Sequence, residues 1–397
     1  MSKRILITSF TFPPQQDGVS HVVEAHATGL ARLGHDVTVV TGLYPPARQT
    51  DTWDGVKVRR YATKGNGQWM LGGYAGDISG YQNFIASFNG DLIICHCWQI
   101  WSTDLAVQVF DSVRCPKMLV SHGVSATTFP KTIKGLLLRL AWQPYLAKMG
   151  GMLQKFDHVV VLSEQKNSKS FFDHKLMHRI NYKQHSVIPN GINKERFALA
   201  SSRVEEFRLR HRIGKKPMLL YVANYDERKN QQMALAVFLE AAPAEAVLML
   251  IGSEINDYAR HLQLLARQAW PEGQRVIILE KQTIEDITTA YFAAELFLCT
   301  SKWELQPLVI LEAMAAGKPF VCTDVGCVRD MPGGIVVRDK QEMVRAVRSL
   351  MEDEPRRGEL GRKGRIAIDE FYTWDRIVKQ YDDLIEKLLF KNPLAKK

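Results

Sequence analysis

The chain has 397 residues, of which 46% are hydrophobic, and it carries a formal net charge of +10. This composition is ample for two hydrophobic cores. The sequence contains no apolar run of about 18 residues and no repeat period or low-complexity tract, so we expect neither a membrane-spanning helix nor a repeat architecture. Lys and Arg outnumber Asp and Glu mainly in residues 1–199, which predicts a basic first half.

The N-terminal segment alternates strand and helix. The expected elements are a strand at 4–9, a turn at Asp17 and Gly18, a helix at 19–33 that Gly34 ends, and a strand at 36–41. Asp17 can form the turn by hydrogen bonding to the backbone that follows it. The same alternation continues along the chain and predicts an α/β fold of doubly wound parallel sheets.

His122 directly follows the predicted strand 117–121, whereas His96 lies inside a strand between two cysteines. Ligands of open α/β sheets bind at the carboxyl ends of the strands. We therefore predict a functional role for His122 and a core position for His96.

The alternation restarts after Gly191, which predicts a second domain. Its first strand is expected at 218–222, followed by a turn at 224–230 that contains Lys229. The predicted boundaries are 1–198 for the first domain, 199–371 for the second, and 372–390 for a C-terminal amphipathic helix.

The segment 296–316 carries the strongest functional signal. A buried strand is expected to run to Thr300, and a helix to start near Gln306 with Pro307 in its first position. The N–H groups of Leu308 and Val309 would then face an anion at the helix N-terminus.

Two glutamates flank this predicted anion site. Glu304 falls in the turn before the helix, and Glu312 lies on the helix face that carries Leu308. Together they could hold hydroxyl groups on either side of a diphosphate. The spacing by itself also fits two solvated surface glutamates.

The stretch 311–326, from Leu-Glu-Ala-Met-Ala to Asp-Val-Gly, resembles the C-terminal signature of the retaining family 4 glycosyltransferases. Pro13-Pro14, the Asp17-Gly18 loop and Gly34-His35-Asp36-Val37-Thr38-Val39 are similar to the start of the same family. The resemblance implies a GT-B fold, in which two Rossmann-like domains face each other across a cleft. The N-terminal domain would bind the acceptor, the second domain would bind the nucleotide sugar, and the C-terminal helix would cross back to the first domain.

The resemblance also implies roles for individual residues. The implied catalytic residues are His122, Glu304 and Lys229, with His122 beside the reacting sugar carbon. The implied donor-binding residues are Gly18, Asn224, Lys229, Leu308, Val309 and Glu312.

Three positions depart from the family pattern. Asp17 stands where the family has a glycine, and Asn224 stands where most members have an arginine that binds the diphosphate. Leu305-Gln306-Pro307 replaces the usual Gly-Phe-Gly. Arg228 could supply the cation that is missing at position 224.

The activity implied is retaining transfer of a sugar from a UDP- or GDP-linked donor to a hydroxyl of a glycan or lipid-linked glycan. Cell-surface polysaccharide or lipopolysaccharide synthesis is the common role of similar enzymes. No Asp-x-Asp motif occurs in the sequence, so we expect a metal-independent enzyme without a separate cofactor. A nucleotide-sugar epimerase of the same fold and a non-catalytic binding scaffold remain as alternatives.

The six cysteines fall mostly in or beside predicted buried strands, and their spacing fits no zinc ribbon, so we expect reduced core thiols. With no separate apolar signal region before Pro13, a cytoplasmic protein is expected.

A basic, apolar stretch around Pro144 is the remaining candidate surface. Leu136, Leu137, Leu140, Trp142, Tyr145, Leu146 and Met149 interleave there with basic residues, and the basic residues of 121–199 include Lys131, Lys134, Arg139, Lys148, Lys155, Lys166, Lys169, Lys175 and Lys183. This pattern fits either a kinked helix on an anionic membrane or a core-facing helix with solvated lysines. No nucleic-acid-binding motif accompanies it, so no nucleic-acid partner is expected.

Overall fold

The computed structural model describes residues 1–15, 17–68, 72–127, 129, 132–164, 172–198, 200–270 and 275–391. The chain divides into two compact units. The first unit combines Met1–Asn190 with Trp374–Lys397, and the second is Gly191–Thr373. The boundary expected from the sequence lay somewhat later, between residues 198 and 199.

The first unit contains a sheet with the strand order β10-β9-β8-β7-β1-β2-β4-β3. All neighbouring strands are parallel except β3 and β4, and β5 and β6 form a separate antiparallel hairpin. The strands are β1 Arg4–Thr8, β2 Asp36–Gly42, β3 Thr50–Trp53, β4 Val56–Tyr61, β5 Thr63–Asn66, β6 Gly73–Gly76, β7 Leu92–His96, β8 Lys117–Val120, β9 His158–Val161 and β10 His185–Val187.

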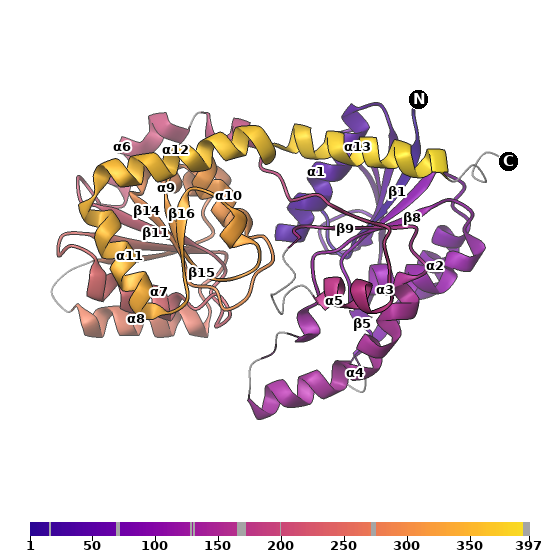
Figure 1. The fold of residues 1–397 in the computed structure, drawn as a ribbon, viewed down its shortest axis with the longest axis horizontal. Helices are drawn as coiled ribbons and strands as arrows, with labels where there is room; N and C mark the ends of the chain where they lie inside the picture. Colours follow the sequence, from indigo (N-terminus) through magenta and orange to yellow (C-terminus); the bar gives the residue numbers. More distant parts are fainter. Residues whose placement is uncertain are drawn as a thin grey trace. The chain divides into compact units, whose positions relative to one another are not determined.

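Helices cover both faces of this sheet (Figure 1). Helices α1 and α13 form the core of one face, and α2 to α5 contribute to the core of the other. The helices are α1 Gly18–Arg32, α2 Ile78–Ala86, α3 Trp101–Val109, α4 Ile133–Leu153, α5 Phe172–Arg179 and α13 Trp374–Lys391, with short 3-10 turns at Phe110–Ser112 and Ser125–Thr127.

The second unit is built on a sheet in which all neighbouring strands are parallel, with the order β13-β12-β11-β14-β15-β16. Its strands are β11 Met218–Val222, β12 Val247–Gly252, β13 Val276–Glu280, β14 Leu296–Cys299, β15 Phe320–Thr323 and β16 Gly334–Val337. Its helices are α6 Val204–Arg210, α7 Gln231–Ala241, α8 Asp257–Ala269, α9 Ile284–Ala293, α10 Leu308–Ala315, α11 Lys340–Glu352 and α12 Glu354–Phe371, with 3-10 turns at Lys194–Phe197, Ala200–Arg203 and Val328–Asp330.

The central strands of the second unit read as continuous apolar runs because both of their faces are covered. Every residue of β11, β12 and β14 is buried. This is the pattern expected of a parallel sheet between two layers of helices. The α/β class predicted from the alternation of strands and helices is confirmed in both units.

Helix α1 begins and ends one residue earlier than the sequence predicts, next to the predicted turn residues Asp17 and Gly34. The Asp17 carboxylate accepts hydrogen bonds from the Val19 and Ser20 N–H groups, at 2.9 and 3.0 Å, and so caps the helix. Gly34 follows the last turn with φ of +92°, a conformation that favours glycine. None of the helices in the described part of the chain is long and apolar enough to cross a membrane.

Candidate functional site

The loops after β11 and β14 form the candidate site of the second unit. These two strands are neighbours, and the chain leaves them in opposite directions, because β12 and β13 lie on one side and β15 and β16 on the other. In open α/β sheets, ligands bind at this reversal of strand order, outside the carboxyl ends of the strands. Lys229 lies in the loop after β11 and Glu304 in the loop after β14, so the sheet topology brings the two together.

Lys229 and Glu304 form an ion pair. The Lys229 Nζ lies 2.5 Å from Glu304 Oε1, and the side chains are only 18% and 11% exposed. The local sequence around Lys229 and around Glu304 does not indicate that the two side chains meet. The cation expected to bind a diphosphate is thus paired with the carboxylate expected to orient the sugar.

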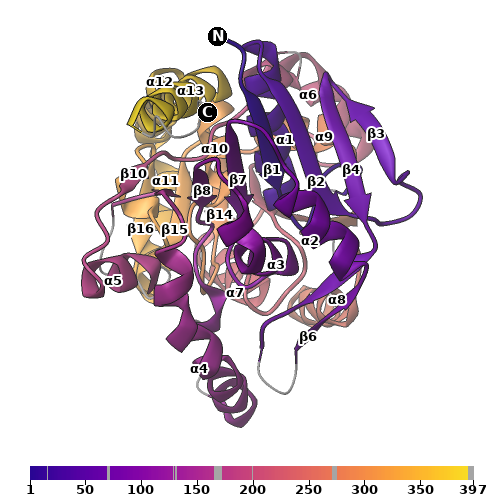
Figure 2. The same cartoon turned by 90° about the vertical axis from the view of Figure 1, so that its right-hand side faces the viewer.

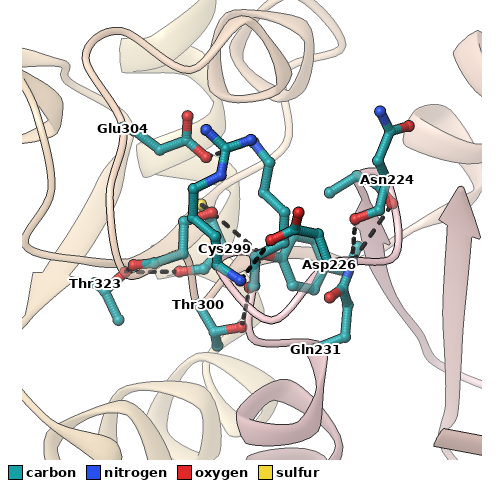
Figure 3. Close-up of polar contacts among 12 residues, drawn as sticks. Asn224, Asp226, Gln231, Cys299, Thr300, Glu304 and Thr323 are labelled. Atoms are coloured by element: carbon teal, nitrogen blue, oxygen red, sulfur yellow. Dashed lines mark hydrogen bonds and ion pairs between the residues drawn. The ribbon is translucent and has the colours of Figure 1, made fainter. Parts of the chain in front are cut away.

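Hydrogen bonds fix the backbone beneath this pair (Figure 3). The Tyr221 hydroxyl donates to the Lys229 carbonyl at 2.5 Å, and the Thr300 hydroxyl donates to the Asn230 carbonyl at 2.8 Å. Thr323, at the end of the next strand, donates to the Ser301 carbonyl at 2.6 Å. The two loops are therefore joined to each other and to β15, which holds Lys229 and Glu304 in a defined position.

Gly326 supports the Glu304 turn from the other side. It adopts φ of +54°, and a Cβ atom added there would lie 1.9 Å from the Leu305 carbonyl oxygen. The N–H of Cys327 donates to the same carbonyl at 2.8 Å. Only a residue without a side chain lets this loop lie so close to the turn that carries Glu304.

Helix α10 begins at Leu308, so the predicted helix start was wrong by one position. Pro307 is the residue before the helix, with φ −71° and ψ 116°, and the first helical position belongs to Leu308. Pro307 has no side-chain hydrogen bond with which to cap the helix. The described residues include no hydrogen-bond acceptor for the N–H groups of Leu308 and Val309. The first turn therefore offers two amide donors to an anion, as the sequence prediction required.

Glu312 is held by Tyr291, which the sequence analysis did not single out. The Tyr291 hydroxyl, on α9, donates to Glu312 Oε2 at 2.8 Å. Burial raises the pKa of Tyr291 well above its ordinary value, and the neighbouring Glu312 carboxylate raises it further. Tyr291 therefore stays protonated and remains a donor that orients Glu312.

Asn224 and Arg228 lie on the same loop but differ in what they contact. In Figure 3, Asn224 lies at the opposite end of the drawn cluster from Glu304, and its carbonyl accepts from Gln231 at 2.9 Å. The Arg228 guanidinium lies 5.6 Å from the ring centroid of Trp303, the residue that precedes Glu304. Besides Lys229, this loop thus brings a second cation, Arg228, next to Trp303, and position 224 contributes none.

In the first unit, Asp17 and Gly18 lie at the start of α1. Besides capping the helix, Asp17 accepts a 2.6 Å hydrogen bond from the Thr11 hydroxyl. Both carboxylate oxygens thus have partners within the unit, which favours the interpretation of Asp17 as a turn residue. Gly18 is the exposed first residue of the helix, one position before Val19.

His122 follows β8 and contacts His96, which ends β7. The His96 Nδ1 and His122 Nε2 atoms are 3.1 Å apart. His96 is fully buried, so its predicted core position is confirmed, but this contact was missed. Burial lowers the pKa of His122 to about 4, with a smaller opposing effect of Asp17, and it lowers the pKa of His96 well below its usual range. Both rings are therefore neutral near pH 7.

Comparison with known proteins decides the family. A model described as "Glycosyltransferase Family 4" matches residues 16–196, and one described as "Glycosyl transferases group 1" matches residues 216–353. Between them, the two models span most of both units. The chain is a family 4 glycosyltransferase.

Solved structures show that this glycosyltransferase has the GT-B fold. Sucrose-phosphate synthase from Thermosynechococcus elongatus superimposes with a TM-score of 0.80 at 20% identity, over 98% of this chain and 100% of that one. HepE from Anabaena, in complex with UDP-glucose, gives a TM-score of 0.73 at 16% identity, over 97% of this chain and 100% of that one.

Curated relatives of the glycosyltransferase match over a smaller share of the chain. Alpha-monoglucosyldiacylglycerol synthase of Streptococcus pneumoniae is 24% identical over 335 residues, which is 80% of this chain and 70% of that protein. The putative teichuronic acid biosynthesis glycosyltransferase TuaC of Bacillus subtilis is 25% identical over 257 residues, 61% of this chain and 55% of that protein. The chain spans about half the length of several other relatives that it matches.

The six cysteines of the glycosyltransferase are free and buried, as predicted. Two of them lie side by side beneath the site, because Cys299 of β14 pairs in register with Cys322 of β15. A hydrogen bond from the Cys322 thiol lowers the pKa of Cys299, while burial raises the pKa of Cys322.

Helix α4 of the glycosyltransferase has two different halves. Its second half faces the core through Trp142, Tyr145 and Met149, which are at most 6% exposed. Its first half exposes four large apolar side chains to between 53% and 82%, and we call these the α4 tip: Ile133, Leu136, Leu137 and Leu140. The helix continues through Pro144. In Figures 1 and 2 its first turns extend beyond the other elements of the unit.

The basic residues predicted around α4 differ in their contacts. Lys134 and Lys148 are exposed on the helix itself, and Arg139 donates to the Phe129 carbonyl. Lys155 pairs with Asp111 at 2.8 Å. Lys131, Lys166 and Lys169 lie outside the described residues.

Proposed function

We propose that this glycosyltransferase moves a sugar, with retention at the anomeric carbon, from a UDP- or GDP-linked donor to a hydroxyl of a glycan or lipid-linked glycan. The proposed setting is the synthesis of a cell-surface polysaccharide, lipopolysaccharide or glycolipid. The Lys229–Glu304 ion pair at the reversal of strand order is the observation that carries the proposal. The structural neighbour that holds UDP-glucose and the glycolipid and polysaccharide relatives support it.

Binding of the donor could break the ion pair and so complete the donor-binding site. When a diphosphate reaches the start of α10, Lys229 can turn from Glu304 to the phosphate oxygens, whose charge it also neutralises in the transition state. Glu304 is then free to accept hydrogen bonds from the sugar hydroxyls. The exposed N–H groups of Leu308 and Val309 add two donors to the same phosphate, and Arg228 adds a second cation.

Glu312 would hold the ribose hydroxyls, with its carboxylate oriented by Tyr291. In the transfer itself, the bond from the anomeric carbon to the diphosphate oxygen breaks and a bond to the acceptor oxygen forms on the same face of the sugar. The leaving phosphate oxygen takes the proton of the acceptor hydroxyl, so the reaction needs no base from the protein. His122 would stabilise the donor beside the reacting carbon.

Protein cations in these positions do what a divalent metal does in other transferases. Among the described residues no group of three His, Cys, Asp or Glu side chains is arranged to hold a metal ion. We propose that activity is retained in excess chelator, and a strict requirement for a divalent metal would contradict this assignment.

The first experiment measures the thermal midpoint of the protein against UDP, GDP, ADP, CMP and their sugar conjugates, with Glu312→Ala as the control. A ligand at about 100 times its Kd adds about 2.7 kcal/mol of stability, which is readily measured. Stabilisation of the wild type by one nucleoside diphosphate, and not of the variant, supports the proposal and identifies the donor. If no nucleotide stabilises the protein, a non-catalytic scaffold becomes the better explanation. Turnover of a nucleotide sugar without any acceptor would instead indicate an epimerase.

We also propose that the α4 tip contacts an anionic membrane that carries the acceptor. Four large apolar side chains are exposed there next to Lys134, and burying them in the interface while lysines meet lipid phosphates is favourable. Replacing Lys134 and Lys148 with Glu should weaken binding to vesicles containing phosphatidylglycerol by roughly thirtyfold or more, because each lysine contributes about 1 kcal/mol. Replacing Leu136, Leu137 and Leu140 with Ser should also weaken this binding, because it removes apolar side chains that the interface would bury.

The matched control for this experiment is Leu264→Ser on α8. Leu264 is exposed to a similar extent, 52%, but does not belong to the α4 tip. It should leave vesicle binding unchanged. If all variants bind vesicles equally and keep their thermal midpoints, the membrane proposal is contradicted. That outcome would not bear on the proposed donor site.

A further inference from the structure

The position of His96 beside His122 follows from the sheet. Strands β7 and β8 are parallel neighbours, with His96 directly opposite Val120. The Cys97 N–H donates to the Val120 carbonyl at 3.0 Å and locks the two strand ends together. His122, two residues beyond Val120, is thereby brought to 3.1 Å from the His96 ring.

A hydrogen bond between two neutral imidazoles has a direction. Each ring carries a single N–H, so one ring donates and the other accepts. Burial keeps the pKa of both rings below neutrality, which excludes a shared extra proton near pH 7. The direction of this bond therefore decides which nitrogen of His122 carries its proton.

The other nitrogen of His96 shows which direction is favoured. His96 Nε2 is buried and has no hydrogen-bond partner among the described residues. The His96 ring packs against the His26 ring, 5.2 Å away between centroids, and His26 is itself packed against Tyr381 at 4.2 Å. A buried N–H without an acceptor is rarer in proteins than an unused lone pair. His96 thus carries its proton on Nδ1, and donates it to His122.

We propose that His96 is a positioning residue that holds His122 in the tautomer protonated on Nδ1. His122 Nε2 is occupied as an acceptor, so the ring presents an N–H to its ligand and has no free lone pair. Resting on the proposed function, this assigns His122 as a hydrogen-bond donor to an oxygen of the sugar nucleotide and excludes it as the base that deprotonates the acceptor.

The tautomer is tested directly by nitrogen NMR of protein labelled with 15N-histidine, with His122 assigned by its loss in His122→Gln. In the wild type, His122 should show a protonated Nδ1 and an unprotonated Nε2. His96→Asn should preserve this state, because the Asn Nδ2 amide occupies the place of the His Nδ1. His96→Leu should shift His122 toward the Nε2–H form.

His26→Phe is the matched control, since His26 is a buried histidine of the same cluster that makes no hydrogen bond to His122. It should change the thermal midpoint and leave the His122 tautomer as it is. A wild-type His122 protonated on Nε2, or a tautomer that is the same in His96→Leu and wild type, overturns the proposal.

Kinetics provide a second readout. His96→Leu should lower kcat by roughly a hundredfold, the lower end of the range for losing one oriented donor, with the Kd of the nucleotide unchanged. His96→Asn should restore most of the rate, whereas a merely structural role predicts equal losses in both variants. If no donor sugar is turned over, the proposed function fails, yet the NMR result still decides the role of His96.

Discussion

In the second unit Lys229 and Glu304 meet as opposite charges, whereas in the first unit His96 and His122 meet as neutral rings. A pair of opposite charges can exchange partners when an anion arrives, because each partner has comparable alternatives. A pair of neutral rings keeps one direction of hydrogen bonding. We therefore propose that the Lys229–Glu304 region rearranges on binding, whereas the His96–His122 region is organised beforehand.

Removing Glu304 should produce the largest effect. Glu304→Ala should reduce transfer by about a thousandfold or more and leave nucleotide binding nearly unchanged, because Lys229 is released to the diphosphate. Glu304→Gln, which keeps the shape without the charge, is the control. Rates with a sugar donor and the Kd of the nucleotide test this, and a parallel loss of both would contradict the separate roles of the two residues.

Gly326→Ala should have the second-largest effect, because it disturbs the turn that carries Glu304 without changing the charge of Glu304. The new Cβ would lie 1.9 Å from the Leu305 carbonyl at a φ of +54°, so the loop must move. We expect a destabilisation of about 1–3 kcal/mol and a loss of activity. Gly358→Ala, in the interior of α12 with no atom within 4 Å of the added Cβ, should instead stabilise slightly. Denaturant unfolding of both variants makes the comparison.

The buried, neutral His26 of the first unit predicts that the stability of the protein depends on pH. Burial lowers the pKa of His26 to about 3. Between about pH 6.5 and pH 3 the unfolded chain binds this proton and the folded chain does not, so stability falls as the pH falls, by up to about 1.4 kcal/mol per pH unit for one group.

His26→Phe should therefore flatten the decline of the unfolding free energy over this range. An equal slope for His26→Phe and the wild type would show that His26 is not held neutral.

Tyr291→Phe should have the smallest effect. It removes the hydroxyl that orients Glu312 and should weaken nucleotide binding up to about tenfold, the value of one hydrogen bond to a charged group. Tyr182→Phe loses a comparable bond to the Phe156 carbonyl, in the first unit, and should leave nucleotide affinity unchanged. Titration calorimetry with the nucleotide found by thermal shift distinguishes them.

The sequence was sufficient for features that depend on local chemistry. The cap of α1 by Asp17, the end of that helix at Gly34, and the free amides of Leu308 and Val309 follow from residue types at fixed offsets. The error at Pro307 is of the same local kind, since proline also suits the position just before a helix.

Contacts across neighbouring strands and helices could not be predicted in this way. The sequence indicates a role for Lys229 and for Glu304 separately. Their pairing depends on β11 and β14 being neighbours in the sheet, and no local sequence pattern reveals which strands are neighbours. His96 was recognised as buried, and its bond to His122 depends on the register of β7 and β8. Tyr291 gave no signal at all, because a tyrosine on an apolar helix face usually indicates packing alone.

The return of α13 to the first unit has a consequence for synthesis of the chain. Its Ile377, Val378 and Tyr381 side chains belong to the same buried core as Val23 and Ala27 of α1. The ribosome makes these residues only after the whole second unit, Gly191–Thr373, has been translated. At about 5–20 residues per second, the first unit waits roughly ten to forty seconds with the apolar stripe of α1 uncovered. The second unit can thus be complete before the first, and the newly made N-terminal segment is the part of the chain that needs protection from aggregation.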